Sequence, residues 1–517
     1  MGTEQGRSRG VTILLVLALS ACSRAKPVVA PDLHTARLAA ADAELRTGCL
    51  DCLVAAFREY DALRSIPAAA DRAAAGTVRS AALIALRQKE LGMVDDGYLQ
   101  RARDAAAAHP AAAAMLPKIL DIIDALPPAS VGAGRPTSDA DLEKMRIVRA
   151  NRAEWTAVLR EHAETDEAVA YTWLSFMCGS SDARDVPREQ LTAAVSPFAD
   201  APLMSYRLAT CRVFEADTLR KLLDGEPRFM EIAYTLGLAD VGRRKLNDAD
   251  KWFDRAYAWH PRWPTLALAM ANVAMTAEEF DRALTMYEAT LGWEPRAVDA
   301  LLGKVRALTY LTRHEDAIAT TDQLLTERWY VGDARYWRAL NETQLTRYEE
   351  AWTDVELAAK LLINAEVPKL AGIIAYRRQQ LEVARGKFDE SRKRNPNDCE
   401  TGFYLGVVLA EQRVWIRTSD VLVDTAQCLA RAEQAAREDI EKIRVSDDPP
   451  ARQARQIAKR EQMIANGRRM MAQSWFNTAV AYYNLERRDE AREYAHKVAD
   501  DEQFGEKARE ILARLNK

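Results

Sequence analysis

The chain has 517 residues, with 72 Lys and Arg against 76 Asp and Glu and a formal net charge of −4. Acidic and basic residues are interspersed, so no basic field indicates a nucleic-acid partner. Glycine and proline are modest at 22 and 19 residues, and no stretch alternates apolar and polar residues for long. The composition therefore favours an all-α chain, either of about three domains or of one long solenoid.

The amino terminus has the pattern of a secretory signal. Arg7 and Arg9 precede a short apolar run, residues 11–19, and small residues follow it up to Cys22. A basic start, a short apolar core and small residues are typical of an exported chain. The apolar run is too short for a permanent membrane helix, which needs about 20 apolar residues. An ordinary cleaved signal followed by an unrelated cysteine is the alternative interpretation.

Residues 19–22, Leu-Ser-Ala-Cys, resemble the end of a bacterial lipoprotein signal. The resemblance implies that residues 1–21 are removed and that Cys22 carries the lipid. Residues 22–35 would then be a lipidated tether that holds the protein to the cell envelope. Ser23 follows the cysteine, which by the same resemblance favours the outer membrane, facing the periplasm.

The half of the chain after the tether is predicted to be helical but irregular. Residues 36–126 have the periodicity of helical hairpins, and residues 127–138 are rich in Pro, Gly and Ser, as a linker is. Residues 139–225 are predicted to form a middle region of shorter helices, with a break near Pro197.

Six cysteines remain besides Cys22, and an exported chain meets oxidising conditions, so disulfides are expected. The connectivity is open from sequence alone. We expect neighbours in the sequence to pair, as Cys49 with Cys52, Cys178 with Cys211, and Cys399 with Cys428.

The spacing of Cys49 and Cys52 is also that of thiol-redox motifs. A thioredoxin-like site needs a βαβ unit, and no such unit is visible around this pair. A structural disulfide is therefore the preferred interpretation, with buried free thiols and a redox site as alternatives.

A fixed period dominates the second half of the chain. Ala249, Ala283, Ala317 and Ala351 recur every 34 residues, each directly after an Asp, Arg or Glu. A period of this length is typical of helical hairpins that stack and bury one another's apolar faces.

Small and large residues repeat with the alanines. Gly237 and Ala271 are small where two helices cross closely, and Phe253 and Tyr287 are large enough to fill the remaining space. The pattern resembles the tetratricopeptide repeat, with an array over 226–412 and a last repeat with a capping helix over 472–517. The resemblance implies an α-solenoid and, in most of its members, protein binding.

In such arrays the first helix of each hairpin lines the concave side. Tyrosine and arginine are well suited to binding hot spots, and Asn272 is placed to hydrogen-bond a peptide backbone. The expected partner-binding groove is Tyr234, Leu268, Asn272, Arg306, Tyr310, Tyr336, Gln344, Tyr376 and Arg377.

Residues 413–471 interrupt the period and are predicted to be a helical insertion. Its second half, 450–471, forms a helix in which six Lys and Arg residues oppose Glu461. Two interpretations remain open, a solvated helix face and an arm that contacts anionic lipid or an acidic partner.

No catalytic pattern is visible. The six histidines lack metal-ligand spacing, and neither a nucleophile elbow nor a phosphate-binding loop is present. We expect no metal, cofactor or small-molecule substrate. The predicted function is a non-enzymatic, lipid-anchored scaffold that captures a protein or peptide. An envelope enzyme using Cys49 and Cys52, or a protein that handles a solute or glycan through the groove aromatics, is the alternative.

Overall fold

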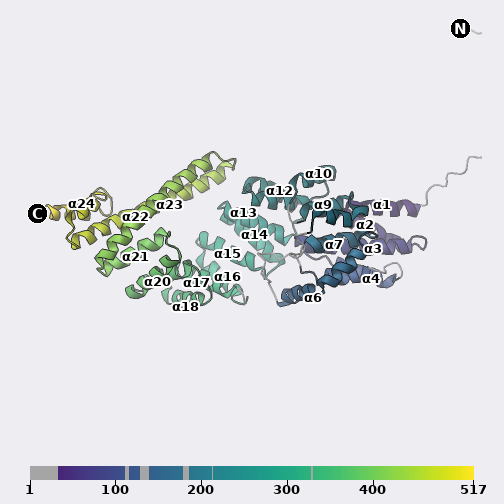
Figure 1. The fold of residues 1–517 in the computed structure, drawn as a ribbon, viewed down its shortest axis with the longest axis horizontal. Helices are drawn as coiled ribbons and strands as arrows, with labels where there is room; N and C mark the ends of the chain where they lie inside the picture. The colour runs from purple at the N-terminus through teal and green to yellow at the C-terminus, as the bar shows by residue number, and fades with distance from the viewer. Residues whose placement is uncertain are drawn as a thin grey trace, which may run out of the picture.

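The computed structural model describes residues 33–110, 116–127, 139–178, 186–211, 214–327 and 330–516. The predicted signal, Cys22 and nearly all of the tether and linker lie outside these residues. The described residues form 25 α-helices and one short 3-10 helix, with no strand among them (Figure 1). The all-α prediction is confirmed.

The irregular N-terminal half contains the first ten α-helices. Gly48 lies between the first two, with a φ of +69°, and a Cβ there would lie 2.4 Å from the side chain of Leu203. The position therefore requires glycine for both its conformation and its packing. The helices are α1 (Leu33–Thr47), α2 (Leu50–Leu63), α3 (Ala70–Leu91), α4 (Tyr98–Ala108), α5 (Leu116–Ala125), α6 (Asp139–His162), α7 (Glu167–Cys178), α8 (Arg188–Ala194), α9 (Pro202–Thr210) and α10 (Ala216–Gly225).

The predicted array is a row of two-helix hairpins that stack in chain order. Successive helices pair along the row, and each hairpin packs on the next. The hairpins are α11 (Glu231–Gly242) with α12 (Leu246–Trp259), α13 (Pro264–Thr276) with α14 (Phe280–Trp293), α15 (Val298–Tyr310) with α16 (His314–Leu324), α17 (Val331–Gln344) with α18 (Tyr348–Ala359), and α19 (Glu366–Arg377) with α20 (Leu381–Arg394).

The 34-residue period is also present in the backbone. Arg244, Glu278, Thr312 and Thr346 each lie in the turn of a hairpin with φ between 57° and 61°. In each turn the next residue donates a hydrogen bond to the carbonyl five residues back, as from Glu279 N to Ala274 O at 2.9 Å. This bond closes the end of the first helix and points the chain into the second.

Small-to-large packing locks the hairpins together. A Cβ on Gly237 would lie 2.3 Å from the ring of Phe253, which confirms the predicted close crossing inside the first hairpin. Tyr287 reaches further than expected, because its ring presses on Gly303 in the next hairpin. The aromatic position therefore joins neighbouring repeats as well as the helices of one repeat.

The N-terminal half and the start of the array share one apolar core. This core runs continuously from Leu38 in α1 to Val273 in α13. Polar contacts cross the same joint: the Trp263 indole N–H donates to the carbonyl of Leu91 at 2.7 Å, and Arg87 pairs with Glu231 at 2.8 Å with both side chains fully buried. The two parts therefore form one continuous body.

The predicted insertion is not a separate element. α21 (Cys399–Glu411) pairs with α22 (Trp415–Arg444), and α23 (Pro450–Asn484) pairs with α24 (Arg488–His496) before the closing helix α25 (Gly505–Leu515). The predicted boundary between 471 and 472 is wrong, because it falls inside α23. Two repeat helices are simply lengthened, so that they project beyond their partners as a long hairpin.

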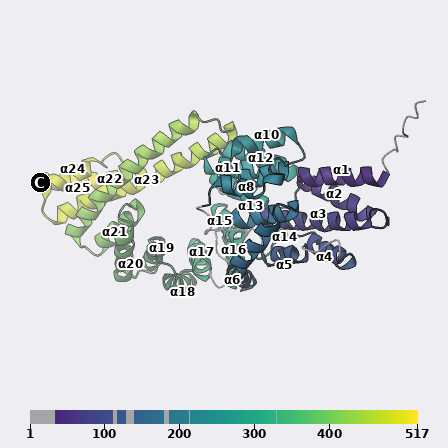
Figure 2. The ribbon, with the colours of Figure 1, turned by 45° about the vertical axis from the view of Figure 1, so that its right-hand side comes forward.

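This long hairpin, α22 with α23, runs back over the array toward α12 (Figures 1 and 2). Its base is held by close packing of Gly406 on Leu422 and by the disulfide between Cys399 and Cys428. The α22 and α23 helices pack along most of their shared length. The chain consequently forms an arc of short hairpins with one long hairpin lying across it.

Candidate partner-binding surface

The first helices of the hairpins lie on the inner side of the arc. The helices α11, α13, α15, α17, α19 and α21 contact one another in succession, and α17 and α19 lie nearer the long hairpin than α18 and α20 do (Figure 2). Helices on the shorter side of a curve approach each other most closely. The predicted groove residues come from these inner helices.

The predicted groove residues differ in exposure. Five are exposed at the surface: Asn272, Arg306, Tyr310, Gln344 and Arg377. Tyr234, Tyr336 and Tyr376 are half-buried. Leu268 is only 7% exposed and belongs to the apolar core of the array, so its assignment to the groove is wrong. Its position on the inner helix turns it toward the neighbouring hairpins, where burial is more favourable than exposure.

Three groove side chains already have partners within the chain. The ring of Tyr234 lies 4.7 Å from that of Trp263, and the Tyr376 hydroxyl donates to Glu411 at 2.6 Å. Burial and that hydrogen bond raise the pKa of Tyr376 to about 12. The carbonyl oxygen of Asn272 accepts a hydrogen bond from the Tyr287 hydroxyl at 2.8 Å. These three side chains therefore stabilise the array itself, and their polar groups are already engaged within the chain.

Tyr310 is the aromatic side chain best placed for contact on this face. It is 50% exposed, and its ring stacks on that of Phe280 with centroids 4.7 Å apart and planes 14° apart. The amino group of Lys459, from the long hairpin, lies 5.4 Å from the Tyr310 ring centroid and 5.6 Å from that of Phe280. This is the geometry of a cation–π contact.

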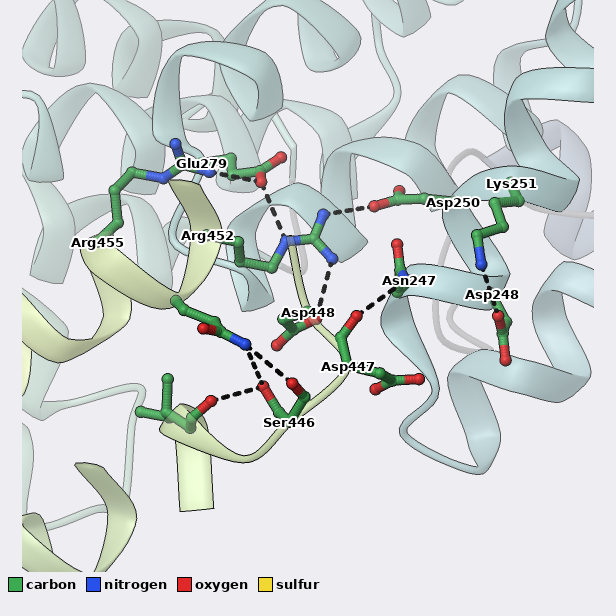
Figure 3. A network of polar contacts seen from close by, with 12 residues as sticks. Asn247, Asp248, Asp250, Lys251, Glu279, Ser446, Asp447, Asp448, Arg452 and Arg455 are labelled. Carbon is green, nitrogen blue, oxygen red and sulfur yellow. Dashed lines mark hydrogen bonds and ion pairs between the residues drawn. The ribbon is translucent and has the colours of Figure 1, made fainter. Parts of the chain in front are cut away.

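Lys459 belongs to a larger charged contact between the hairpin tip and the start of the array, which we call the latch. Figure 3 shows the part of it around Arg452 and Arg455. On the array it consists of Asp250, Glu278 and Glu279, and on α23 it consists of Arg452, Arg455, Lys459 and Arg460. Arg452 is its centre: the side chain is 4% exposed and contacts Asp250 at 2.5 Å and Glu279 at 3.1 Å.

The rest of the latch surrounds Arg452. Arg455 pairs with Glu279 at 2.7 Å, while Lys459 and Arg460 pair with Glu278 at 3.0 and 2.6 Å. Asn247 adds a hydrogen bond to the carbonyl of Asp447 at 3.3 Å. Four of the six cations of the 450–471 helix therefore pair with acids of the array, and three of these four remain partly exposed to solvent.

The sequence contained a signal for this contact. Arg452, Arg455 and Lys459 are spaced by three and four residues, which places them on one face of a helix. The acidic pair Glu278 and Glu279 occupies a hairpin turn, where side chains project outward. What the sequence lacked was any indication that residues 173 to 202 positions apart would meet.

Electrostatics favour the ionised form of Glu279 in the latch. Burial alone would raise the pKa of Glu279, but the hydrogen bond from Arg452, the charge of that side chain and the neighbouring Arg282 hold the pKa below its usual value. Arg282 also pairs with Asp250 at 3.1 Å. Each of these two acids therefore has more than one cationic partner.

The three disulfides pair as predicted, between Cys49 and Cys52, Cys178 and Cys211, and Cys399 and Cys428. Cys49 and Cys52 are both 0% exposed, and Cys49 Sγ accepts a hydrogen bond from the Cys52 N–H at the start of α2. Disulfide exchange needs direct attack by a thiolate on a sulfur. A covered pair at a helix start is consistent with a structural role and does not support the redox alternative.

Cys22 lies outside the described residues. Within the part of the chain that the structure describes, no helix combines the length and apolar character needed to cross a membrane, and no group of His, Cys, Asp and Glu side chains is arranged to hold a metal ion.

No family model and no curated protein matches the sequence. Solved structures do resemble parts or most of the fold. The Cut9–Hcn1 hetero-tetramer of the APC/C is 12% identical with a TM-score of 0.38, and the match covers 94% of this chain and 97% of that one.

Two bacterial proteins are also similar. A tetratricopeptide repeat protein from Parabacteroides merdae is 16% identical over 56% of this chain and 99% of its own, with a TM-score of 0.34. A thermophilic TPR protein in Thermus thermophilus is 16% identical over 35% and 98%, with a TM-score of 0.30. The period, turns and interlocking aromatic residues described above make the arc of this chain an array of tetratricopeptide-type hairpins.

Proposed function

We propose that this chain is a protein-interaction scaffold, anchored by a lipid in the bacterial cell envelope, that captures a protein or peptide on the inner face of its arc. The observation that carries the proposal is the inner face itself. It presents exposed Tyr310, Arg306, Gln344 and Arg377 on helices that a continuous stack of hairpins holds in place. A rigid surface with aromatic and guanidinium groups binds polypeptide without a large ordering cost.

The proposed location depends on the amino terminus. The basic start, the short apolar run and the Leu-Ser-Ala-Cys sequence at residues 19–22 support export followed by lipidation of Cys22. Acyl chains supply membrane affinity at about 0.8 kcal/mol for each buried methylene. The outer membrane, facing the periplasm, is the location that Ser23 favours.

Partner capture is tested by crosslinking in intact membranes and recovery of the chain. We expect Tyr310→Ala combined with Tyr336→Ala to reduce recovery of a partner about tenfold or more, as the loss of hot-spot aromatics does. Trp293→Ala is the matched control, because Trp293 is 46% exposed and lies on α14, a second helix of its hairpin. Equal recovery by the double variant and the control would contradict the groove assignment.

Anchoring is tested separately. Cys22→Ala should move the protein from the membrane to the soluble fraction, since the acyl chains that hold it would not be attached. Cys22→Ser is a second variant with the same expectation and a smaller change in side-chain size. Retention of both variants in washed membranes would contradict the lipid anchor while leaving partner capture to its own test.

A further inference from the structure

The long hairpin touches the array in two places that differ in kind. At its base, Leu422 packs on Gly406 and the Cys399–Cys428 disulfide joins α21 to α22. At its tip, the latch joins α23 by ion pairs to α12 and to the turn between α13 and α14. A hydrogen bond from Asn247 to the carbonyl of Asp447 and the cation–π contact of Lys459 with Tyr310 on α15 lie beside it. The base therefore has a covalent link and apolar packing in addition to ion pairs such as Arg392 with Asp424, whereas the tip is held by polar contacts.

The strength of the ion pairs at the tip depends on the salt concentration. Interactions between partly exposed charges weaken as salt is added, because the screening length falls from about 8 Å at physiological ionic strength to about 3 Å at 1 M. Three of the four cations of the latch remain 26% to 46% exposed: Arg455, Lys459 and Arg460. Only Arg452 is shielded from solvent, at 4%.

The latch also covers part of the inner face. Lys459 is positioned over the stacked rings of Phe280 and Tyr310, so the hairpin occupies the position that a ligand cation would take there. The arc from α12 to α21 and the returning hairpin together form a closed ring of chain (Figure 2). A partner that places a cation over the Tyr310 ring on this side must therefore displace Lys459.

We infer that the α22–α23 hairpin is a releasable strap. The latch closes the arc into a ring, release of its ion pairs opens the ring, and this opening controls access to the inner face at Tyr310. The consequence for a partner rests on the proposed function, but the opening itself is a property of the isolated chain.

The experiment measures the ring directly by single-molecule energy transfer. Donor and acceptor dyes are attached through azide-bearing residues introduced at Val445, which is 85% exposed at the tip, and at Lys251 on α12, which is 66% exposed. This chemistry leaves the three disulfides intact. In the unaltered chain at physiological salt we expect one population of high transfer efficiency.

Charge reversal should open the ring. We expect Glu278→Lys with Glu279→Lys to lower the ratio of closed to open molecules on the order of tenfold, since several attractive pairs become repulsive. Adding Arg455→Glu and Lys459→Glu should restore most of the closed population. Glu288→Lys is the matched control, because Glu288 lies on the same helix as Phe280 but pairs with Lys304.

A second measurement needs no variant. Raising the salt to 1 M should shift the unaltered chain toward low transfer efficiency, while its helical circular dichroism stays constant. Unchanged efficiency in both the reversed-charge variant and high salt would overturn the inference, because the base alone would then hold the hairpin in place. If the ring opens but partner recovery does not change, the opening of the hairpin stands and its control of access to Tyr310 is overturned.

Discussion

Two arginines, each paired with an acid of the first repeat hairpin, join segments that are far apart in the sequence. Arg87 pairs with Glu231 with both side chains at 0% exposure, and its guanidinium lies 4.1 Å from the ring centroid of Tyr206. Arg452 pairs with Asp250 at 4% and 10% exposure. The first pair lies beside an apolar core that both segments share. The second lies where the tip of the long hairpin meets α12.

The two buried ion pairs differ in how many partners each carboxylate has. Glu231 has few alternative partners, since its other contact is the N–H of Leu50 at 2.9 Å. Asp250 has Arg282 as well as Arg452. Removal of Arg87 leaves a charge in an apolar site, whereas removal of Arg452 leaves carboxylates that a second cation still compensates.

The largest expected effect is at the Arg87–Glu231 pair, which joins the N-terminal half to the array. Arg87→Met should destabilise the chain by about 3–5 kcal/mol, because Glu231 is left charged and enclosed. Denaturant unfolding followed by circular dichroism measures the loss. Arg87→Met combined with Glu231→Leu should recover most of the stability, and a double variant as unstable as the single one would contradict this explanation.

The next effect loosens the base of the long hairpin. Replacing Cys399 and Cys428 by serine should cost roughly 3–4 kcal/mol, since the disulfide closes a loop with a sequence separation of 29. Hydrogen exchange should rise in α21 and α22 and stay unchanged in α3. Equal exchange in both regions would mean that the two ends of the molecule are more tightly coupled than the comparison supposes.

A pH effect is expected from a buried glutamate in the N-terminal region. Burial raises the pKa of Glu167 to about 7. Because the folded state holds this proton more tightly than the unfolded state, its contribution to stability is present below the usual pKa and is lost as the pH rises toward 7. We expect a loss on the order of 2 kcal/mol between pH 4.5 and 7. Unfolding at several pH values measures it, and Glu167→Gln should remove the share that Glu167 contributes, while the share of Glu342, whose pKa burial also raises to about 7, should remain.

The smallest expected effect on stability is at the latch. Arg452→Met should cost only about 1 kcal/mol, because Asp250 and Glu279 keep Arg282 as a partner. The change should nevertheless increase the open fraction in the energy-transfer measurement. Arg468→Met is the matched control, since Arg468 pairs with Glu433 within the hairpin. A loss as large as that of Arg87→Met would remove the distinction between the two arginine ion pairs.

The sequence predicted features that depend on local spacing. The alanine period located the hairpins, and the pairing of neighbouring cysteines was correct for all three disulfides. The close crossing at Gly237 was correct because the small and large residues lie on one hairpin. Each of these signals involves residues about 34 positions apart or fewer.

Features that depend on distant contacts were missed. The boundary placed inside α23 arose because the repeat pattern resumes at its C-terminal end while its N-terminal end carries none of the landmarks. A repeat helix can be lengthened without any change in its hydrogen-bond pattern. The sequence therefore shows no break at the point where a repeat helix of ordinary length would begin. Leu268 was assigned to the groove because a helix position does not reveal which neighbour will cover it.

The left-handed residues in the hairpin turns have a consequence for heat tolerance. This conformation costs a residue other than glycine roughly 1 kcal/mol, and in the described part of the chain seven such residues adopt it at the turns of the repeat hairpins: Arg244, Glu278, Thr312, Thr346, Gln379, Arg413 and Glu486. Glycine at most of these corners would relieve strain and make the arc more resistant to melting. At Glu278 the same exchange would also remove the carboxylate that pairs with Lys459 and Arg460. Thermal stability would rise there while the closed ring became less stable.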